Sequence, residues 1–122
     1  MTIEAFTISK IMLKICLFQS VYTLYASGYS STGTDVGDEF SAQAGSYTHV
    51  GMAFSTFDND NDNFAGVNCA ADGGYWYDDC YDSSLNSLNL GAGSNHPWYK
   101  GIQWYPWINY QESAKSVYMA IQ

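Results

Sequence analysis

Short apolar stretches separated by turn-forming residues make up most of the chain after Val21. The stretch VYTLY at residues 21–25 alternates, which is typical of a half-buried strand. GYSSTGTDVGD at residues 28–38 is rich in turn formers, and GMAFSTF at residues 51–57 is a short apolar run. No segment has the period of a long amphipathic helix, so the pattern predicts short strands joined by long turns.

The last nine residues, AKSVYMAIQ, have the two-residue period of a strand with one buried face. Val117, Met119 and Ile121 fall on one face, and Tyr118 and Ala120 fall on the other. The pattern therefore predicts a closing strand at residues 114–122.

Residues 1–18, MTIEAFTISKIMLKICLF, differ in composition from the rest. They hold two of the four basic residues, Lys10 and Lys14, and an apolar run that is too short to span a membrane. One interpretation is a secretory leader with these lysines as its positive region and ICLFQSVYTLYA as its apolar region; the other is an unrelated extension. We therefore expect the domain itself to cover residues 19–122.

Composition limits the class of protein. The 122 residues fit one domain, and with 47% hydrophobic and 17% aromatic residues they can form a core. Only four Lys and Arg stand against twelve Asp and Glu, for a net charge of −8, so a nucleic acid is excluded as a partner by repulsion. An acidic surface rich in Tyr, Trp, Gly, Asn and Ser suits calcium and neutral hydroxylated or acetylated ligands.

Three aspartates, Asp58, Asp60 and Asp62, occupy every second position of the segment DNDND. On an extended strand they would crowd on one side, and either a divalent cation or a loop that separates them would relieve the repulsion. An EF-hand loop is excluded, because Asn63 replaces its Gly, Cys69 replaces its bidentate Glu, and no flanking helices are expected.

Two interpretations of the aspartates remain. One is another oxygen cage, in which two carboxylates combine with backbone carbonyls of a turn at residues 64–66, where Gly66 lets the chain curl around an ion. The other is a solvated acidic turn with no ligand.

The three cysteines form no C-x-x-C pair, so a zinc ribbon or a thioredoxin-like motif has no support. Cys69 and Cys80 close a loop that a disulfide would stabilise by about 3 kcal/mol in an oxidising compartment. The alternative is that all three are buried thiols in a cytosolic protein. Cys16 lies far away and is interpreted as unpaired or as part of a removed leader.

Several segments together resemble the C-terminal half of a fibrinogen-related domain, the module of fibrinogen chains, ficolins, angiopoietins and tachylectin-type lectins. In order they are GYSSTGTDVGD, GMAFSTFDNDNDNFAGVNCA, GYWYDDC, SLNSLNLG, HPWYKGIQW and AKSVYMAIQ. The resemblance covers roughly residues 21–122. It implies an α+β fold, a partial fibrinogen C-terminal-like module with short antiparallel strands, long loops and a disulfide-stapled calcium loop. The N-terminal subdomain and most of the central sheet of that module have no counterpart.

The resemblance also implies a calcium site. Asp60 and Asp62 would supply carboxylates, and the backbone carbonyls of Phe64 and Gly66 would complete the protein ligands. Val67, an extra residue relative to the family, follows these ligands and leaves the expected site intact.

The same resemblance implies a Cys69–Cys80 disulfide and a cis peptide at Asp79–Cys80 beside the ligand pocket. Calcium would then be structural and would order that pocket.

Four aromatic residues occupy the positions of the family's acetyl-binding pocket: Tyr81, Trp98, Tyr99 and Tyr110. Tyr81 stands where lectin members commonly have His, and Trp98 and Tyr99 stand where Tyr and Ala are usual. With Trp98 and Tyr99 at these positions a ring could fill a small pocket, and the shorter loop between the cysteines deletes the place where a pocket Tyr often lies.

These features predict an extracellular, secreted, calcium-binding recognition module that is lectin-like and binds acetylated or neutral glycan groups, with protein partners also possible. The alternative is a protein-interaction or truncated structural fragment without a competent pocket. No motif for a nucleophile, phosphate loop or catalytic metal is present, so we expect no enzyme. Trp76, Trp104 and Trp107 are expected in the core.

Overall fold

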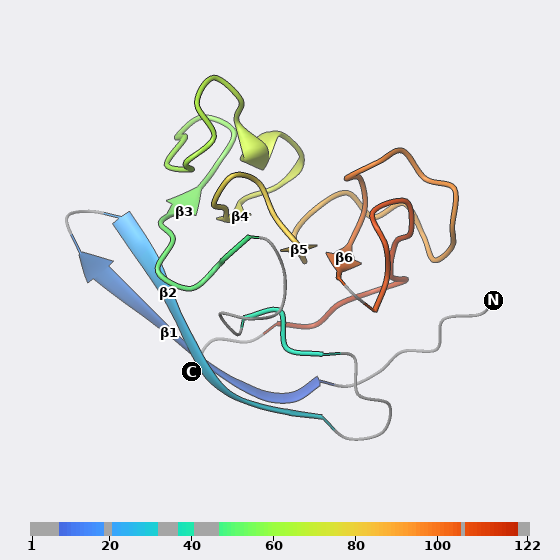
Figure 1. Cartoon of the computed structure of the whole chain (residues 1–122), viewed down its shortest axis with the longest axis horizontal. Helices are drawn as coiled ribbons and strands as arrows, with labels where there is room; N and C mark the ends of the chain where they lie inside the picture. The colour runs from blue at the N-terminus through green and yellow to red at the C-terminus, as the bar shows by residue number, and fades with distance from the viewer. Residues whose placement is uncertain (1–7, 19–20, 32–36, 41–46, 106, 120–122) are drawn as a thin grey trace.

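A long hairpin forms the N-terminal part of the protein (Figure 1). The structure, a computed structural model, describes residues 8–18, 21–31, 37–40, 47–105 and 107–119. Strand β1, Ile8–Phe18, pairs antiparallel with β2, Val21–Ser31, in a register that places Phe18 opposite Val21 and Met12 opposite Ser27. The remaining described chain lies along one side of this hairpin (Figure 1).

The strand predicted at residues 21–25 is confirmed, but β2 continues to Ser31 through part of the segment that was expected to form turns. Pairing with β1 explains this difference, because the hydrogen bonds between the two strands outweigh the weak local preference of Gly and Ser for turns. The pairing is irregular between Ile8 and Met12, and Gly28 has a φ of +72° opposite this region. The expected division at residues 18 and 19 stays a prediction.

Two further pairs of strands are only two residues long. β3, Phe54–Ser55, pairs with β4, Tyr75–Trp76, and β5, Ser83–Ser84, pairs with β6, Gln103–Trp104, all antiparallel. Of the apolar run at residues 51–57, only β3 is a strand. Short antiparallel strands and long loops are thus present as predicted.

A single turn of 3-10 helix, η1 at Cys69–Asp72, follows the aspartate-rich segment. Asn68 caps it, because the Asn68 Oδ1 accepts a hydrogen bond from the Ala70 N–H at 2.8 Å. A Cβ at Gly73, directly after η1, would collide with the backbone carbonyl of Asn86, so this position requires glycine. In the part of the chain that the structure describes, η1 alone represents the helical component of the expected α+β class.

Aromatic side chains dominate the core. Trp76 and Trp104 are buried, as predicted, and each indole N–H donates to a distant backbone carbonyl at 2.9 Å: Trp76 to Tyr22 and Trp104 to Gly37. Trp107 is half-buried and packs against the same core. The buried apolar residues are Leu24, Phe40, Ala70, Tyr75, Trp76, Tyr77, Tyr81, Ile102, Trp104, Ile108 and Ala114.

His49 joins β4 to β5 inside this core. The Ser83 N–H donates to the His49 Nε2 at 3.1 Å, so the proton is on Nδ1, which donates to the Trp76 carbonyl at 2.7 Å. Burial lowers the pKa of His49 because the charged ring would lose its solvation. This histidine is therefore a neutral structural residue.

The predicted closing strand is wrong for residues 114–119, which form no strand. The last bridge joins Gly93 to Ser113, and the Ala114 N–H donates to the Ile102 carbonyl at 2.9 Å; beyond it Val117 and Tyr118 are exposed, the latter at 91%. A strand exists only where a neighbour completes its ladder, and no described strand pairs with residues 115–119. Ile121 and the rest of residues 120–122 lie outside the described residues.

Candidate functional site

The acidic loop, residues 58–68, turns between β3 and η1 rather than continuing as a strand. Thr56 and Asn59 exchange backbone hydrogen bonds of 3.0 and 3.2 Å, which closes a turn at its start. The Asp58 carboxylate accepts from the Thr56 hydroxyl at 2.7 Å. The turn thus holds Asp58 locally, and the three carboxylates do not line one side of a strand.

Asp60 and Asp62 remain neighbours within the acidic loop. The Asp62 N–H donates to the Asp60 Oδ1 at 3.2 Å, and the two Asp62 oxygens accept from the backbone N–H groups of Phe64 and Cys69, both at 2.8 Å. Burial raises the pKa of Asp62, and the nearby Asp60 carboxylate adds to this effect, whereas the two N–H donors oppose it. Asp62 is thus the carboxylate around which the loop closes.

The asparagines between the aspartates attach the loop to the rest of the protein. Asn61 bonds to the Ser55 hydroxyl and the Phe54 carbonyl, both at 2.9 Å, and Asn63 bonds to Asp78 through its backbone N–H at 3.0 Å and its side chain at 2.7 Å. The Asp-Asn alternation therefore separates two tasks, since asparagines bind the protein and aspartates concentrate charge. Sequence reasoning considered only the aspartates.

The donor chemistry of the acidic loop fits a hard cation. Two adjacent carboxylates and a tight turn are present, with the Val67 N–H donating to the Phe64 carbonyl at 3.1 Å and Gly66 at a φ of +82°. Among the described residues, however, no group of three or more His, Cys, Asp or Glu side chains comes together. Any cage must therefore rely on backbone carbonyls, and Phe64 and Gly66 as ligands stay a prediction.

The disulfide expected beside the loop is present. Cys69 and Cys80 are joined with a Cα–Cα distance of 5.1 Å. Cys80 has a φ of +60°, a left-handed conformation that is uncommon for a residue with a side chain. Cys16 lies in β1, and the cis peptide expected at Asp79–Cys80 stays a prediction.

Four rings form what we call the aromatic surface: Trp98, Tyr99, Tyr105 and Tyr110. Tyr110 is central, with its ring centroid 4.6 Å from Tyr99, 5.1 Å from Tyr105 and 6.5 Å from Trp98. Trp98 is 60% and Tyr99 43% exposed. Three of the four predicted pocket residues thus lie together and in contact with solvent.

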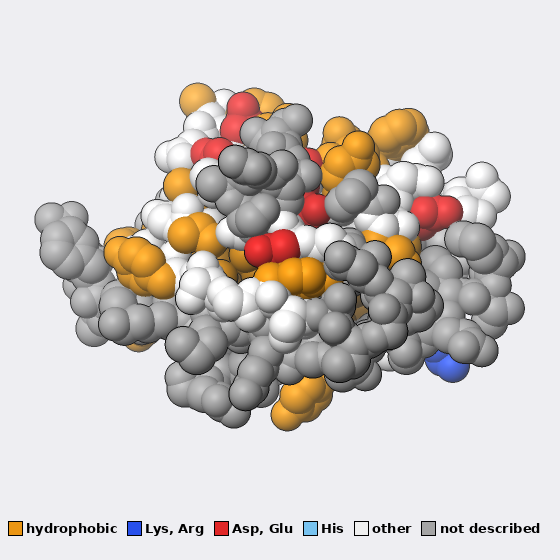
Figure 2. Space-filling view, turned by 60° about the horizontal axis from the view of Figure 1, so that its bottom comes forward, with side chains coloured by type: hydrophobic (Ala, Val, Ile, Leu, Met, Phe, Trp, Pro, Cys, Tyr) orange, Lys and Arg blue, Asp and Glu red, His pale blue; other side chains and the backbone are white. Residues whose placement is uncertain are grey.

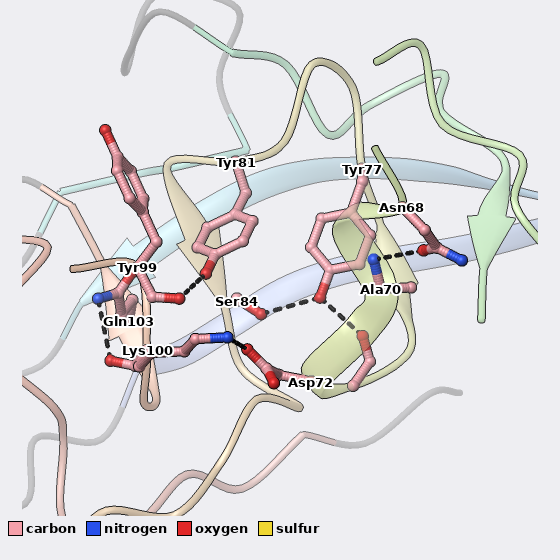
Figure 3. Close-up of polar contacts among 10 residues, drawn as sticks. Asn68, Ala70, Asp72, Tyr77, Tyr81, Ser84, Tyr99, Lys100 and Gln103 are labelled. Carbon is pink, nitrogen blue, oxygen red and sulfur yellow. Dashed lines mark hydrogen bonds and ion pairs between the residues drawn. The ribbon is translucent and has the colours of Figure 1, made fainter. Parts of the chain in front are cut away.

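The fourth predicted pocket residue, Tyr81, is buried, and its hydroxyl points toward the backbone of Tyr99 (Figure 3). Its hydroxyl donates to the Tyr99 backbone carbonyl, and its ring meets the Tyr99 ring edge-on at 6.1 Å. Burial raises the pKa of Tyr81. Tyr81 therefore supports Tyr99 from inside the protein, and only the exposed rings, such as Trp98 and Tyr99, are accessible to a ligand.

Backbone geometry presents Tyr99 to solvent. The Lys100 N–H donates to the Pro97 carbonyl at 3.2 Å in a tight turn, and Tyr99 has a φ of +57°. The Tyr99 N–H donates to the Tyr110 carbonyl at 2.9 Å, which fixes the two rings relative to each other. The left-handed residue is thus held by its neighbours.

Sequence reasoning missed two residues of this site. Tyr105 stacks on Tyr110 with their ring planes 3° apart, and Asp82, which is fully buried, accepts a hydrogen bond from the Tyr110 hydroxyl. The sequence around Asp82 gives little sign of its role, because the burial of Asp82 and of the two serines that follow it is known only from the structure.

A chain of contacts connects the acidic loop to the aromatic surface, and Figure 3 shows its last part, the ion pair between Asp72 and Lys100. Asp62 holds the first residue of η1, Cys69, and the last residue of η1, Asp72, forms an ion pair with Lys100. Lys100 directly follows Tyr99. The two regions are therefore joined through one short helix and one ion pair.

The described surface gives no indication of a nucleic-acid partner. Figure 2 shows acidic side chains scattered among apolar ones on the face that it presents. Among the described residues, no helix has both the length and the apolar character needed to span a membrane.

Comparison with known families gives a match over most of the chain. Residues 9–122 match the family described as fibrinogen beta and gamma chains, C-terminal globular domain. The match begins within the segment that the sequence set apart as residues 1–18.

Individual proteins in the same comparison are similar over more than four fifths of this chain. Microfibril-associated glycoprotein 4 of Bos taurus is 39% identical over 103 residues, 83% of this chain and 36% of that protein. Fibrinogen-like protein 1 of Mus musculus is 34% identical over 108 residues, covering 85% and 34%. Techylectin-5A of Tachypleus tridentatus is 36% identical over 104 residues, covering 84% and 32%. The chain spans about a third of the length of these relatives.

Proposed function

The chain belongs to the family of the C-terminal globular domain of fibrinogen beta and gamma chains, and from this we propose that it is a non-enzymatic extracellular recognition module. The module binds calcium at the acidic loop and takes acetylated or neutral glycan groups at the aromatic surface. A relative named as a lectin, Techylectin-5A, supports the glycan part of the proposal.

The arrangement of Asp60 and Asp62 supports the calcium part. Two adjacent carboxylates repel each other, and a bound divalent cation would remove that cost while Phe64 and Gly66 add backbone carbonyls. Calcium would stabilise the loop that already holds Cys69. Its role is structural, because η1 and the ion pair of Asp72 with Lys100 lead from this loop to Tyr99.

The single observation that carries the recognition proposal is the exposed aromatic surface around Tyr110. Trp98 and Tyr99 remain exposed although both pack against this ring. Large exposed apolar groups that are held rigidly lose little entropy on binding, so they favour recognition of a ligand by stacking. Neutral sugars and acetyl groups suit such rings on a protein with a charge of −8.

Thermal unfolding of the oxidised protein tests the calcium site. We expect calcium, and not magnesium, to raise the melting temperature relative to EDTA, because a ligand at 100 times its Kd adds about 2.7 kcal/mol to the folded state. Asp60→Ala and Asp62→Ala should abolish the shift. Asp58→Ala, in the same loop but bonded to Thr56, is the matched control and should retain it.

Retention on a resin that carries an N-acetylated sugar tests recognition. We expect retention that requires calcium, elution by EDTA, and loss of retention in Trp98→Ala with an unchanged melting temperature. Retention that is indifferent to Trp98 would place the binding site elsewhere.

The second candidate function is a protein-interaction or truncated structural module without a glycan pocket. The burial of Tyr81 beneath Tyr99 favours it, because this ring fills space that a small acetyl group would need. Calcium-dependent stabilisation without any sugar retention would support this second function over the first.

A further inference from the structure

A second pair of carboxyl groups, Glu39 and Asp82, is buried beneath the aromatic surface. Glu39 is 2% exposed and Asp82 is 0% exposed. The two groups are close enough to interact electrostatically. Neither contributes to the acidic loop, so a separate role is required for two costly buried acids.

The hydrogen bonding of the two groups is unequal. Asp82 accepts from the Tyr47 N–H at 2.9 Å and from the Tyr110 hydroxyl, an arrangement that suits an ionised carboxylate. Among the residues that the structure describes, neither oxygen of Glu39 has a hydrogen-bond partner. A buried carboxylate without donors is expensive, whereas a protonated carboxyl group is not charged and costs much less.

Proton binding at Glu39 follows from its surroundings. Burial, and then the charges of Asp82 and Asp38, raise the pKa of Glu39 to about 8. The other titratable groups around it are Tyr75, which interacts with Glu39, and His49, whose ring contacts Phe40 and Tyr75. Neither supplies a positive charge at neutral pH, since burial lowers the pKa of His49.

We propose that Asp82 is a positioning residue for the aromatic surface, and that it holds Tyr110 in place only while Glu39 carries a proton. The proposal rests on the function proposed above, because it makes recognition at this surface weaken as the solution becomes alkaline.

If Glu39 loses its proton, it repels Asp82, and one of the two groups must move. Either movement disturbs rings of the aromatic surface. If Asp82 moves, it releases the hydroxyl of Tyr110. If the segment that carries Glu39 moves, it breaks the hydrogen bond from Trp104 to the Gly37 carbonyl. Trp104 directly precedes Tyr105, which stacks on Tyr110, so this second route also reaches the aromatic surface.

The test compares the wild-type protein with Glu39→Gln between pH 6.5 and 9.0. Near-ultraviolet circular dichroism reports the packing of the tyrosines without any ligand. We expect the wild-type signal to change with a midpoint near pH 8 and the Glu39→Gln signal to stay constant. Asp58→Asn is the control, because it removes a surface carboxylate that is not among the charges that raise the pKa of Glu39, and it should follow the wild type.

Retention on the N-acetylated sugar resin provides the functional readout. If only the protonated form binds, wild-type affinity should fall about tenfold between pH 7 and pH 9, and that of Glu39→Gln should not. Tyr110→Phe, which lacks the hydroxyl that Asp82 holds, should show a smaller pH response of binding than the wild type, because only the route through Trp104 remains.

The outcomes separate this proposal from the function on which it rests. A pH-dependent tyrosine signal that Glu39→Gln abolishes, without sugar retention, would support the buried pair and reject the glycan ligand. Identical profiles in the wild type and Glu39→Gln would overturn the proposal. If Glu39→Gln does not fold, a binding profile in Tyr110→Phe that still matches the wild type would overturn it as well.

Discussion

Two pairs of carboxyl groups in this protein show two ways of placing like charges together. Asp60 and Asp62 lie in the acidic loop, where each oxygen of Asp62 receives a backbone N–H. Glu39 and Asp82 are both buried, Asp82 below Tyr110, and Glu39 receives no donor from any described residue. We expect the first pair to bind a cation and the second pair to be stable only with a proton.

The two pairs differ in where their hydrogen-bond donors come from along the chain. The acidic loop supplies donors from residues close in sequence, since Phe64 and Cys69 follow Asp62 by two and seven positions. The donors of Asp82 come from Tyr47 and Tyr110, 35 and 28 positions away. The proposed cation site thus depends on local donors, and the proposed pH response depends on donors from distant parts of the chain.

Removal of the disulfide should have the largest effect, and it should affect the calcium response of the acidic loop but not the pH response of the buried pair. Replacing Cys69 and Cys80 with Ser should lower the free energy of unfolding by about 3 kcal/mol, since the closed loop no longer restricts the unfolded chain. Serine at position 69 keeps the backbone N–H that donates to Asp62, but without the disulfide this N–H is no longer fixed, so the calcium response should weaken while the pH response of Glu39 persists. Urea unfolding with and without calcium measures both effects.

Cys16→Ser is the control for this experiment, because it removes a thiol and leaves the Cys69–Cys80 disulfide intact. An undiminished calcium response after removal of the disulfide would show that the acidic loop does not depend on η1.

The second-largest expected effect is a loss of stability with rising pH that is caused by Glu39. The folded-state pKa of Glu39 is about 8 and its ordinary value is 4.5, so its contribution to stability is complete below pH 4.5 and is lost as the pH rises to 8. The slope is up to about 1.4 kcal/mol per pH unit. Between pH 6.5 and 8 the wild type should lose about 2 kcal/mol, measured by urea unfolding.

Glu39→Gln should remove this slope, and Asp62→Asn should not. A slope of equal size in Glu39→Gln would assign the pH dependence to another group.

The smallest expected effect concerns the connection between the acidic loop and the aromatic surface. Lys100→Met breaks the partly exposed ion pair with Asp72 and should change stability by only about 0.5 kcal/mol. The melting shift caused by calcium should remain, but sugar retention should depend less on calcium. Lys115→Met, at an exposed position, is the control and should leave both properties unchanged.

Several features of the fold and site could be predicted because they depend on local sequence or on distinctive motifs. The strand at residues 21–25, the Cys69–Cys80 disulfide and the buried Trp76 and Trp104 are all present. The turn at Gly66 follows from the conformational freedom of glycine within a short segment.

The remaining features depend on partners that the local pattern does not reveal. The tail at residues 114–119 alternates like a strand, but a strand also needs a neighbour. Tyr105 belongs to the aromatic surface only because it stacks on Tyr110. Glu39 is polar and adjacent to turn formers, so its burial comes from the packing of Phe40 against Trp104 and His49.

The two buried indoles also affect how fast the chain can fold. Trp76 bonds to Tyr22 across 54 positions, and Trp104 bonds to Gly37 across 67. The strands at which these tryptophans lie are two residues long and cannot form early as stable local units. Long loops must therefore close before core contacts contribute any stability. We expect the slow folding, on the order of milliseconds to seconds, of proteins with high contact order.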